Sequence, residues 1–190
     1  LYTFSSENWS RPKMEVSALM KLLLKTITKE VSELNKNNVR LTSIGALEEM
    51  PKEARQGILD GIEKTKNNTG LNLVLALSYG GRQEILKAVK QLCADLEKGE
   101  ITTSDIDPTM FENYLYTANT PDPELLIRTG GENRISNFLL WQIAYTELFV
   151  TDVYWPAFRE EELLIAIQNY QERERRFGKV SEQLGKRHVV

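Results

Sequence analysis

The segment RTGGENRIS, from Arg128 to Ser136, carries the strongest chemical signal in the sequence. Its two arginines, Arg128 and Arg134, each present a planar guanidinium fork that suits the oxygens of a phosphate group. Gly130 and Gly131 allow backbone N–H groups to come close to an anion, and Ser136 adds a hydroxyl donor. Together these features predict a cradle for a diphosphate.

The same residues allow a structural alternative. Both arginines could instead pair with Glu124, Glu132 or Glu147 and hold a loop in place, because structural ion pairs are common. Residue types alone favour neither interpretation. The segment is not a Walker loop, since GxxxxGK[ST] is absent from the chain, and it is not a Rossmann fingerprint.

Two carboxylates, Glu132 and Glu147, lie close in sequence to this arginine-rich segment. A diphosphate held by arginines is often also bridged by Mg²⁺, which prefers oxygen ligands and keeps several waters. Glu147 lies in the apolar stretch IAYTELFV, where a carboxylate is costly unless it is paired or bound to a metal. The residues alone favour the simpler interpretation, in which Glu147 neutralises a neighbouring arginine.

Two other polar segments could contact an anion. Ser5, Asn8 and Arg11 could hydrogen-bond a phosphate or position a proton, although SSENW is more typical of a helix-capping loop. Residues 80–82, GGR, could bind an anion at a helix N-terminus. A plain turn from strand to helix explains these glycines equally well.

An alternation of strands and helices must position these segments. Apolar residues recur at steps of three and four after Pro12 and again from Leu47 to Lys66, which predicts two amphipathic helices. Residues 71–79, LNLVLALSY, are almost all apolar and predict a central strand buried on both faces. We expect further strands at 1–4, 39–45, 124–128 and 153–155, and further helices at 85–96, 108–116, 138–150 and 160–177.

This order of elements favours an α/β fold: a single domain with a mainly parallel central sheet flanked by helices. Ligands of such sheets bind beyond the carboxyl ends of the strands. The segments 4–8, 78–82 and 128–136 each follow a predicted strand, so we expect them to converge on one rim. The periodicity of the helix after Pro12 does not distinguish a filled core from an apolar tunnel between helix and sheet.

Composition excludes several classes of protein. The chain has 190 residues and a net charge of −3, which argues against a broad nucleic-acid-binding face. Its single cysteine, Cys93, and single histidine, His188, exclude an internal disulfide, a cysteine zinc cluster and a multi-histidine metal site. No apolar run is long enough for a membrane span, and no signal peptide is evident. We therefore expect a cytoplasmic protein.

The chain resembles the cis-prenyltransferase family, and within it the bacterial undecaprenyl diphosphate synthases. The resemblance runs from Leu1 to about Gly178, and its matching segments are LYTFSSENWSRPKMEVSALM, ALSYGGRQEI, PELLIRTGGENRISNFLLWQIAYTELFVTDVYWPAF and ERERRFG. It implies that the protein adds isopentenyl diphosphate repeatedly to an allylic diphosphate, usually farnesyl diphosphate, with Mg²⁺ as cofactor. It also implies an apolar tunnel for the growing chain, and a product that serves as the lipid carrier of cell-wall glycans.

The same resemblance assigns roles to individual residues. It places the isopentenyl diphosphate site on Arg128, Arg134 and Ser136, and a metal-linked glutamate on Glu147, with Glu132 in the same motif.

At the other end of the chain, the resemblance gives Ser5 and Asn8 roles in substrate positioning and proton removal. It makes Phe4, Trp9 and Arg11 substrate-contacting or loop-ordering residues. An R-x-G element, Arg176 to Gly178, would reach across a homodimer toward the partner's active site.

The family's first motif, of the form H-x-x-x-I-M-D-G-N-x-R-W, is absent from these residues. It carries an aspartate that binds Mg²⁺, so we expect residues upstream of Leu1, since a missing first strand would leave an unsatisfied sheet edge. Residues 1–178 would then be a catalytic domain and 179–190 a mobile tail. A long polyprenyl product implies peripheral contact with the inner face of the membrane. The alternative function is a non-catalytic subunit of a heteromeric prenyltransferase.

Overall fold

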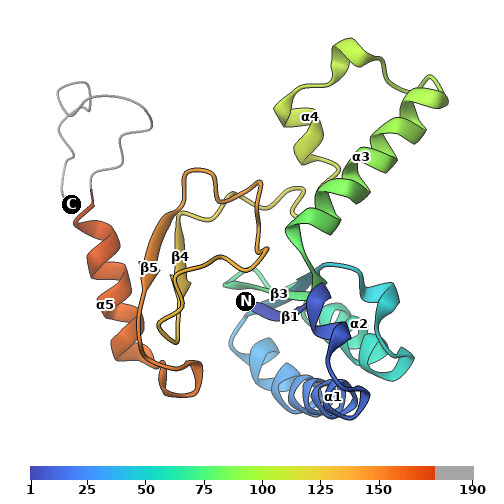
Figure 1. Cartoon of the computed structure of the whole chain (residues 1–190). Coiled ribbons are helices and arrows are strands. Elements are labelled where there is room, and N and C mark those ends of the chain that lie inside the picture. The colour runs from blue at the N-terminus through green and yellow to red at the C-terminus, as the bar shows by residue number, and fades with distance from the viewer. Residues whose placement is uncertain (174–190) are drawn as a thin grey trace. The chain divides into compact units, whose positions relative to one another are not determined.

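Strands and helices alternate over residues 2–97 (Figure 1). The structure is a computed structural model that describes residues 1–173, and it divides into two compact units, Leu1–Thr120 and a second that begins at Pro121. The first contains β1 (Tyr2–Ser5), η1 (Ser6–Ser10), α1 (Lys13–Lys36), β2 (Arg40–Ile44), η2 (Leu47–Glu49), α2 (Lys52–Thr65), β3 (Asn72–Tyr79), α3 (Gly81–Glu97), η3 (Thr103–Asp105) and α4 (Pro108–Glu112).

The first unit is built on a three-stranded parallel sheet in the order β1-β3-β2. The apolar strand β3 lies in the centre, as predicted, and its last five residues are buried. Its register with β2 runs without interruption from Arg40 opposite Asn72 to Ile44 opposite Ala76. The carboxyl ends of β1 and β3 are adjacent, with Ser5 opposite Tyr79, so the loops after these two strands start side by side.

Two amphipathic helices, α1 and α2, pack against each other and supply most of the hydrophobic core with the sheet (Figure 1). The predicted stripes are confirmed, because Met20 and Ile27 of α1 and Ile58 of α2 are among the buried residues. Gly61 permits the close packing of these elements: a Cβ at this position would lie 2.9 Å from Cγ2 of Val31.

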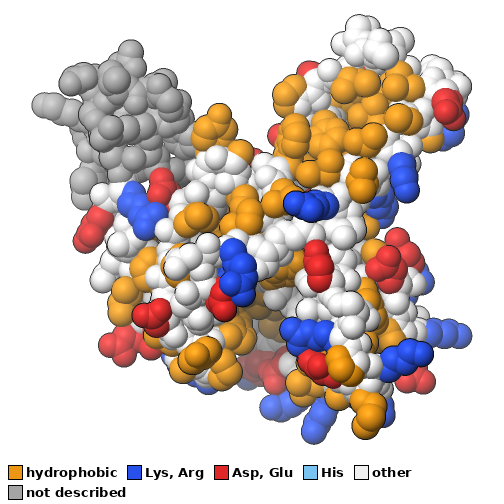
Figure 2. Space-filling view, viewed as in Figure 1, with side chains coloured by type: hydrophobic (Ala, Val, Ile, Leu, Met, Phe, Trp, Pro, Cys, Tyr) orange, Lys and Arg blue, Asp and Glu red, His pale blue; other side chains and the backbone are white. Residues whose placement is uncertain are grey.

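Helix α3 departs from the expected pattern. Residues 85–96 form a helix as predicted, but two of its apolar side chains, Leu86 and Val89, are 60% and 43% exposed. The buried face of the helix carries Leu92 together with Ala88 and the carboxylate Glu84. Apolar side chains consequently gather on the surface around α3 and α4 (Figure 2).

The second unit holds a two-stranded parallel sheet, β4 (Leu125–Arg128) and β5 (Glu147–Val150), followed by η4 (Trp155–Ala157) and α5 (Glu160–Gln171). The predicted helix at 138–150 is wrong, because residues 138–146 form turns and 147–150 form β5. Leu139, at the start of the predicted helix, has left-handed backbone with a φ of 46°, which is incompatible with a regular helix there. The predicted strand at 153–155 is also wrong, since the chain turns there into η4.

The last predicted helix, 160–177, is observed as α5 up to Gln171, and residues beyond 173 lie outside the described part of the chain. The α/β class and the parallel pairing of the strands are as expected. None of the helices in the described part is long and apolar enough to cross a bilayer.

Candidate functional site

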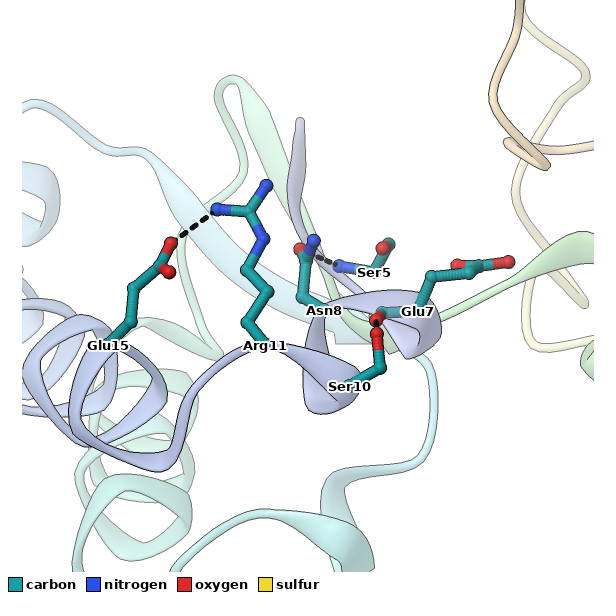
Figure 3. A network of polar contacts seen from close by, with 6 residues as sticks. All are labelled: Ser5, Glu7, Asn8, Ser10, Arg11 and Glu15. Carbon is teal, nitrogen blue, oxygen red and sulfur yellow. Dashed lines mark hydrogen bonds and ion pairs between the residues drawn. The ribbon is translucent and has the colours of Figure 1, made fainter.

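The loop after β1 forms the short helix η1, and polar side chains of this loop bond to its own backbone (Figure 3). The backbone N–H of Ser5 donates to Oδ1 of Asn8 at 2.9 Å, and the hydroxyl of Ser10 donates to the carbonyl of Glu7 at 2.7 Å. The capping interpretation of this loop is therefore confirmed. The bond to Ser5 also fixes the orientation of the Asn8 side chain, which a positioning residue needs.

Arg11 lies just after η1, and its Nη1 donates to Oε1 of Glu15, in the first turn of α1, at 2.7 Å (Figure 3). Both side chains are about half exposed, at 51% and 46%. An exposed pair of this kind contributes little to stability. Its effect is to hold the guanidinium near the start of α1, where it lines a pocket.

This pocket has a volume of about 330 Å³ and is lined by residues of η1, α1 and the start of α2. Its apolar lining comes from Trp9, Val16, Met20, Pro51 and Ala54. The charged lining comes from Arg11, Lys13, Lys21 and Glu53, with Ser17. The volume lies within the roughly 300–1,000 Å³ that is typical of small-molecule sites. The apolar tunnel that the resemblance implies is not established by this pocket and stays a prediction.

Two aromatic residues hold one side of the pocket. Phe4 is buried in the core, and its ring meets that of Trp9 edge-on, with centroids 4.8 Å apart and an interplanar angle of 67°. The indole Nε1 of Trp9 donates to Oγ of Ser78 at 2.7 Å, and this hydroxyl donates to Oε2 of Glu49 at 2.5 Å. Sequence reasoning did not single out Ser78 or Glu49 as partners of Trp9, because the three lie in segments far apart along the chain.

Tyr2 lies on β1 beside this loop, and its hydroxyl donates to the carbonyl of Tyr79 at 3.1 Å. Burial, reinforced by the negative charge of Glu7, raises the pKa of Tyr2 to about 12. The phenol is therefore neutral at ordinary pH and acts as a hydrogen-bond donor.

In the second unit, the expected role of the two glycines of RTGGENRIS is not borne out. The N–H of Gly130 donates to the carbonyl of Val153 at 3.0 Å, and that of Gly131 donates to the carbonyl of Thr151 at 2.9 Å. These bonds tie the loop after β4 to the segment after β5. The two N–H groups are therefore engaged and do not offer themselves to an anion.

The two arginines of the segment differ in their surroundings. Arg134 pairs with Glu132, and both side chains are substantially exposed, so the structural alternative holds for this residue. Arg128 ends β4, and its Nε is buried without a hydrogen-bond partner among the described residues. A buried N–H without an acceptor lowers the stability of the fold, so a ligand oxygen that accepts from this Nε would be favourable. Ser136 adopts left-handed backbone with a φ of 50°.

Glu147, the first residue of β5, accepts a hydrogen bond on Oε2 from Nη1 of Arg173 at 2.8 Å. The simpler interpretation, pairing with an arginine, therefore describes this carboxylate in the structure. Across residues 1–173 there is no group of three or more His, Cys, Asp or Glu side chains arranged to hold a metal. The carboxylate of Glu147 fits Mg²⁺ as one ligand among several, with waters and the oxygens of a bound diphosphate supplying the rest. Mg²⁺ usually binds to proteins in this way.

Sequence reasoning missed one buried carboxylate, Glu84, which is 1% exposed. Its Oε2 accepts from the hydroxyl of Tyr79 at 2.6 Å, and its Oε1 accepts from the backbone N–H of Tyr116 at 2.9 Å. Glu84, Ala88 and Leu92 are four residues apart, and this spacing could have shown that Glu84 shares the buried face of the helix. These bonds join the start of α3 to the loop after α4.

The candidate residues thus fall into two groups, one in each unit. Phe4, Ser5, Asn8, Trp9 and Arg11 lie together on β1 and η1. A second group lies at the end of β4, in the loop after it, and on β5, and its members are Arg128, Arg134, Ser136 and Glu147. The convergence of both groups on one rim stays a prediction. Arg176 and Gly178 lie outside the described residues.

Comparison with known proteins gives a consistent family assignment. The family model described as "Putative undecaprenyl diphosphate synthase" matches residues 1–178. The chain is 52% identical over 178 residues to an isoprenyl transferase of Clostridium perfringens, covering 94% of this chain and 70% of the relative. It is 51% identical over 178 residues to a Micrococcus luteus enzyme named ditrans,polycis-undecaprenyl-diphosphate synthase, (2E,6E)-farnesyl-diphosphate specific, covering 94% and 72%.

The fold is similar to that of a solved structure of lavandulyl diphosphate synthase from Lavandula x intermedia, in complex with dimethylallyl diphosphate. The TM-score is 0.91 at 36% sequence identity, and the match covers 94% of this chain and 77% of the other.

Proposed function

Because this chain belongs to the undecaprenyl diphosphate synthase family of prenyltransferases, we propose that it condenses isopentenyl diphosphate repeatedly onto farnesyl diphosphate. Each condensation adds one cis isoprene unit. The product is a long-chain polyprenyl diphosphate, and we propose undecaprenyl diphosphate, the carrier lipid of cell-wall glycans. The name of the Micrococcus luteus relative supports this choice of allylic substrate and product.

The pocket at the start of α1 is the observation that carries the proposal. An allylic diphosphate joins a hydrocarbon chain to two phosphates, so its site needs an apolar surface beside cationic groups. The pocket supplies both, because its lining combines the buried side chains of Met20 and Ala54 with the exposed cations Arg11, Lys13 and Lys21. We assign the hydrocarbon to the apolar lining and the diphosphate to the cations.

The second substrate, isopentenyl diphosphate, is assigned to Arg128, Arg134 and Ser136. The buried, unpartnered Nε of Arg128 supports this assignment, because a phosphate oxygen would satisfy it. Arg134 would exchange Glu132 for the diphosphate, at low cost because that ion pair is exposed.

The reaction joins C4 of isopentenyl diphosphate to C1 of the allylic diphosphate. The C1–O bond of the allylic substrate breaks, diphosphate leaves with the bonding electrons, and a proton is lost from C2 of the isopentenyl unit. We propose that Ser5 and Asn8 position the reacting groups and assist this proton loss. The hydrogen bond between them supports a positioning role, since it fixes the Asn8 side chain.

We propose that Mg²⁺ is the cofactor and that Glu147 helps to hold it. When bound, Mg²⁺ would neutralise charge that develops on the departing diphosphate. Glu147 is only partly exposed, and its present partner, Arg173, could pair with the diphosphate when the carboxylate turns to the ion. This site would depend on the substrate for most of its oxygen ligands.

Three further assignments complete the proposal. The protein acts as a homodimer in the cytoplasm, and the resemblance gives Arg176 and Gly178, which lie outside the described residues, a role in that dimer. Its hydrophobic product requires peripheral contact with the membrane. The catalytic domain corresponds to residues 1–178, the span of the family match.

The test is elongation by the full-length protein, given radiolabelled isopentenyl diphosphate, farnesyl diphosphate and Mg²⁺. We expect butanol-extractable long-chain products that disappear when the metal is chelated. Arg11→Gln should raise KM for farnesyl diphosphate, whereas Lys25→Gln, an exposed cation of α1 outside the pocket lining, should not. The absence of elongation would contradict the proposal and favour a non-catalytic subunit.

A further inference from the structure

One hydroxyl group connects three segments around the pocket. Oγ of Ser78, near the end of β3, accepts a hydrogen bond from the Trp9 indole of η1 at 2.7 Å. The same hydroxyl donates to the carboxylate of Glu49, at the end of η2, at 2.5 Å. Donor and acceptor directions are thereby both fixed, since a serine hydroxyl has a single proton to donate.

The local backbone shows that this position is constrained. Ser78 is 4% exposed and has a φ of 47°, a left-handed conformation that is uncommon for residues other than glycine. Its carbonyl accepts from the N–H of Ala46, which ties the end of β3 to the start of η2. Such a conformation persists when surrounding contacts stabilise it. At Ser78 it places the hydroxyl between the Trp9 indole and the Glu49 carboxylate.

The network joins two segments that contribute to the lining of the pocket. Trp9 lines the pocket and packs on Phe4, so its ring is held by an aromatic contact and its nitrogen by Ser78. Glu49 lies two residues before Pro51, which also lines the pocket. The Trp9–Ser78–Glu49 chain of hydrogen bonds therefore links the Trp9 wall to the segment that precedes α2.

We propose that Ser78 and Glu49 are positioning residues that fix the Trp9 indole as a wall of the allylic substrate pocket. Ser78 acts by accepting from the indole, and Glu49 acts by orienting the Ser78 hydroxyl toward that role. The role in substrate binding rests on the proposed function of the pocket. The effect of Ser78 and Glu49 on the position of the Trp9 indole is independent of that function.

Two measurements test this proposal in the full-length protein. The first is the ¹⁵N–¹H resonance of the Trp9 indole, identified among the three tryptophans by its loss in Trp9→Phe. The second is KM for farnesyl diphosphate. Ser78→Ala should shift the Trp9 resonance and raise KM by roughly 2- to 12-fold, the equivalent of one hydrogen bond of ordinary net strength. The value of kcat should change by less than about twofold, because the indole contacts substrate rather than the reacting bonds.

Glu49→Ala provides a second variant, because Glu49 is exposed and its removal spares the core. It should shift the same resonance and raise KM less than Ser78→Ala, and Glu49→Gln, which keeps an acceptor oxygen, should restore both values. Thr42→Val is the matched control: it removes a hydroxyl bond of 3.1 Å to Asn72 at the other end of the sheet. It should change neither measurement.

The outcomes separate the two proposals. If the wild-type protein elongates but neither Ser78→Ala nor Glu49→Ala changes KM, the positioning role is refuted. An unmoved Trp9 resonance in both variants refutes it too, whatever the activity. If the wild-type protein does not elongate, the proposed function fails, and the indole resonance still decides whether Ser78 and Glu49 hold Trp9.

Discussion

Replacing Arg128 with methionine should separate a substrate-binding arginine from a structural one. The Nε of Arg128 is buried and has no hydrogen-bond partner among residues 1–173, so the substitution removes no hydrogen bond at this atom. Methionine keeps an unbranched side chain of similar length and eliminates the unpaired donor. Because an unsatisfied buried donor costs about 1–3 kcal/mol, we expect the free energy of unfolding to stay unchanged or to rise.

The same substitution should damage binding of isopentenyl diphosphate. A hydrogen bond to a charged group contributes about 1.5–3 kcal/mol, which corresponds to roughly a 12- to 140-fold loss in kcat/KM for this substrate. The assay pairs a saturation curve in isopentenyl diphosphate with urea unfolding of the substrate-free protein. Arg159→Met, which removes an exposed arginine of the same unit, is the control and should change neither value.

The opposite pattern would refute this reasoning. If Arg128→Met lowers the free energy of unfolding while kcat/KM is unchanged, Arg128 is a structural residue. The assignment of isopentenyl diphosphate to this segment would then lose its main support.

Three further predictions concern the unit that contains the pocket. Gly45→Ala should lower the free energy of unfolding, measured in urea, by about 2 kcal/mol or more. Its φ is 110°, and the new Cβ would lie 2.0 Å from the carbonyl oxygen of Leu77. An unchanged urea midpoint would contradict this backbone conformation of Gly45. Ile58→Ala should cost roughly 2–5 kcal/mol in the same assay, because the side chain is 1% exposed in the core, and a loss below 1 kcal/mol would argue against that packing. The raised pKa of Tyr2 favours its neutral form in the folded protein, so its contribution to stability is complete below pH 10 and is lost as the pH rises from 10 to about 12. Tyr2→Phe should reduce the decrease in the free energy of unfolding between pH 10 and about 12. Tyr145→Phe, at a 73% exposed position, should leave this decrease as in the wild type.

Local periodicity predicted the elements and their buried residues correctly where a helix or strand buries a continuous apolar stripe. The residues that face the core from α1 and α2, such as Met20 and Ile58, follow steps of three and four and were predicted correctly. The central place of β3 followed from its nearly uninterrupted apolar run. These elements position the loop after β1, so the grouping of Ser5, Asn8 and Trp9 was predictable.

Other features depend on contacts that no local pattern encodes. Helix α3 buries Glu84 because Tyr79 and a distant backbone N–H satisfy the carboxylate, and its apolar side chains Leu86 and Val89 remain exposed. The engagement of Gly131 by Thr151 depends on the course of the chain after β5. The network through Ser78 joins side chains that are 69 and 29 residues away along the chain, so only the folded structure shows it.

The central claim is that the pocket at the start of α1 holds the allylic substrate. A crystal structure of the full-length protein with farnesyl thiodiphosphate, a slowly reacting analogue, tests it most directly. We expect the hydrocarbon to lie against Val16, Met20 and Ala54, and the diphosphate to contact Arg11. Analogue density at another site, with this pocket filled only by solvent, would contradict the account.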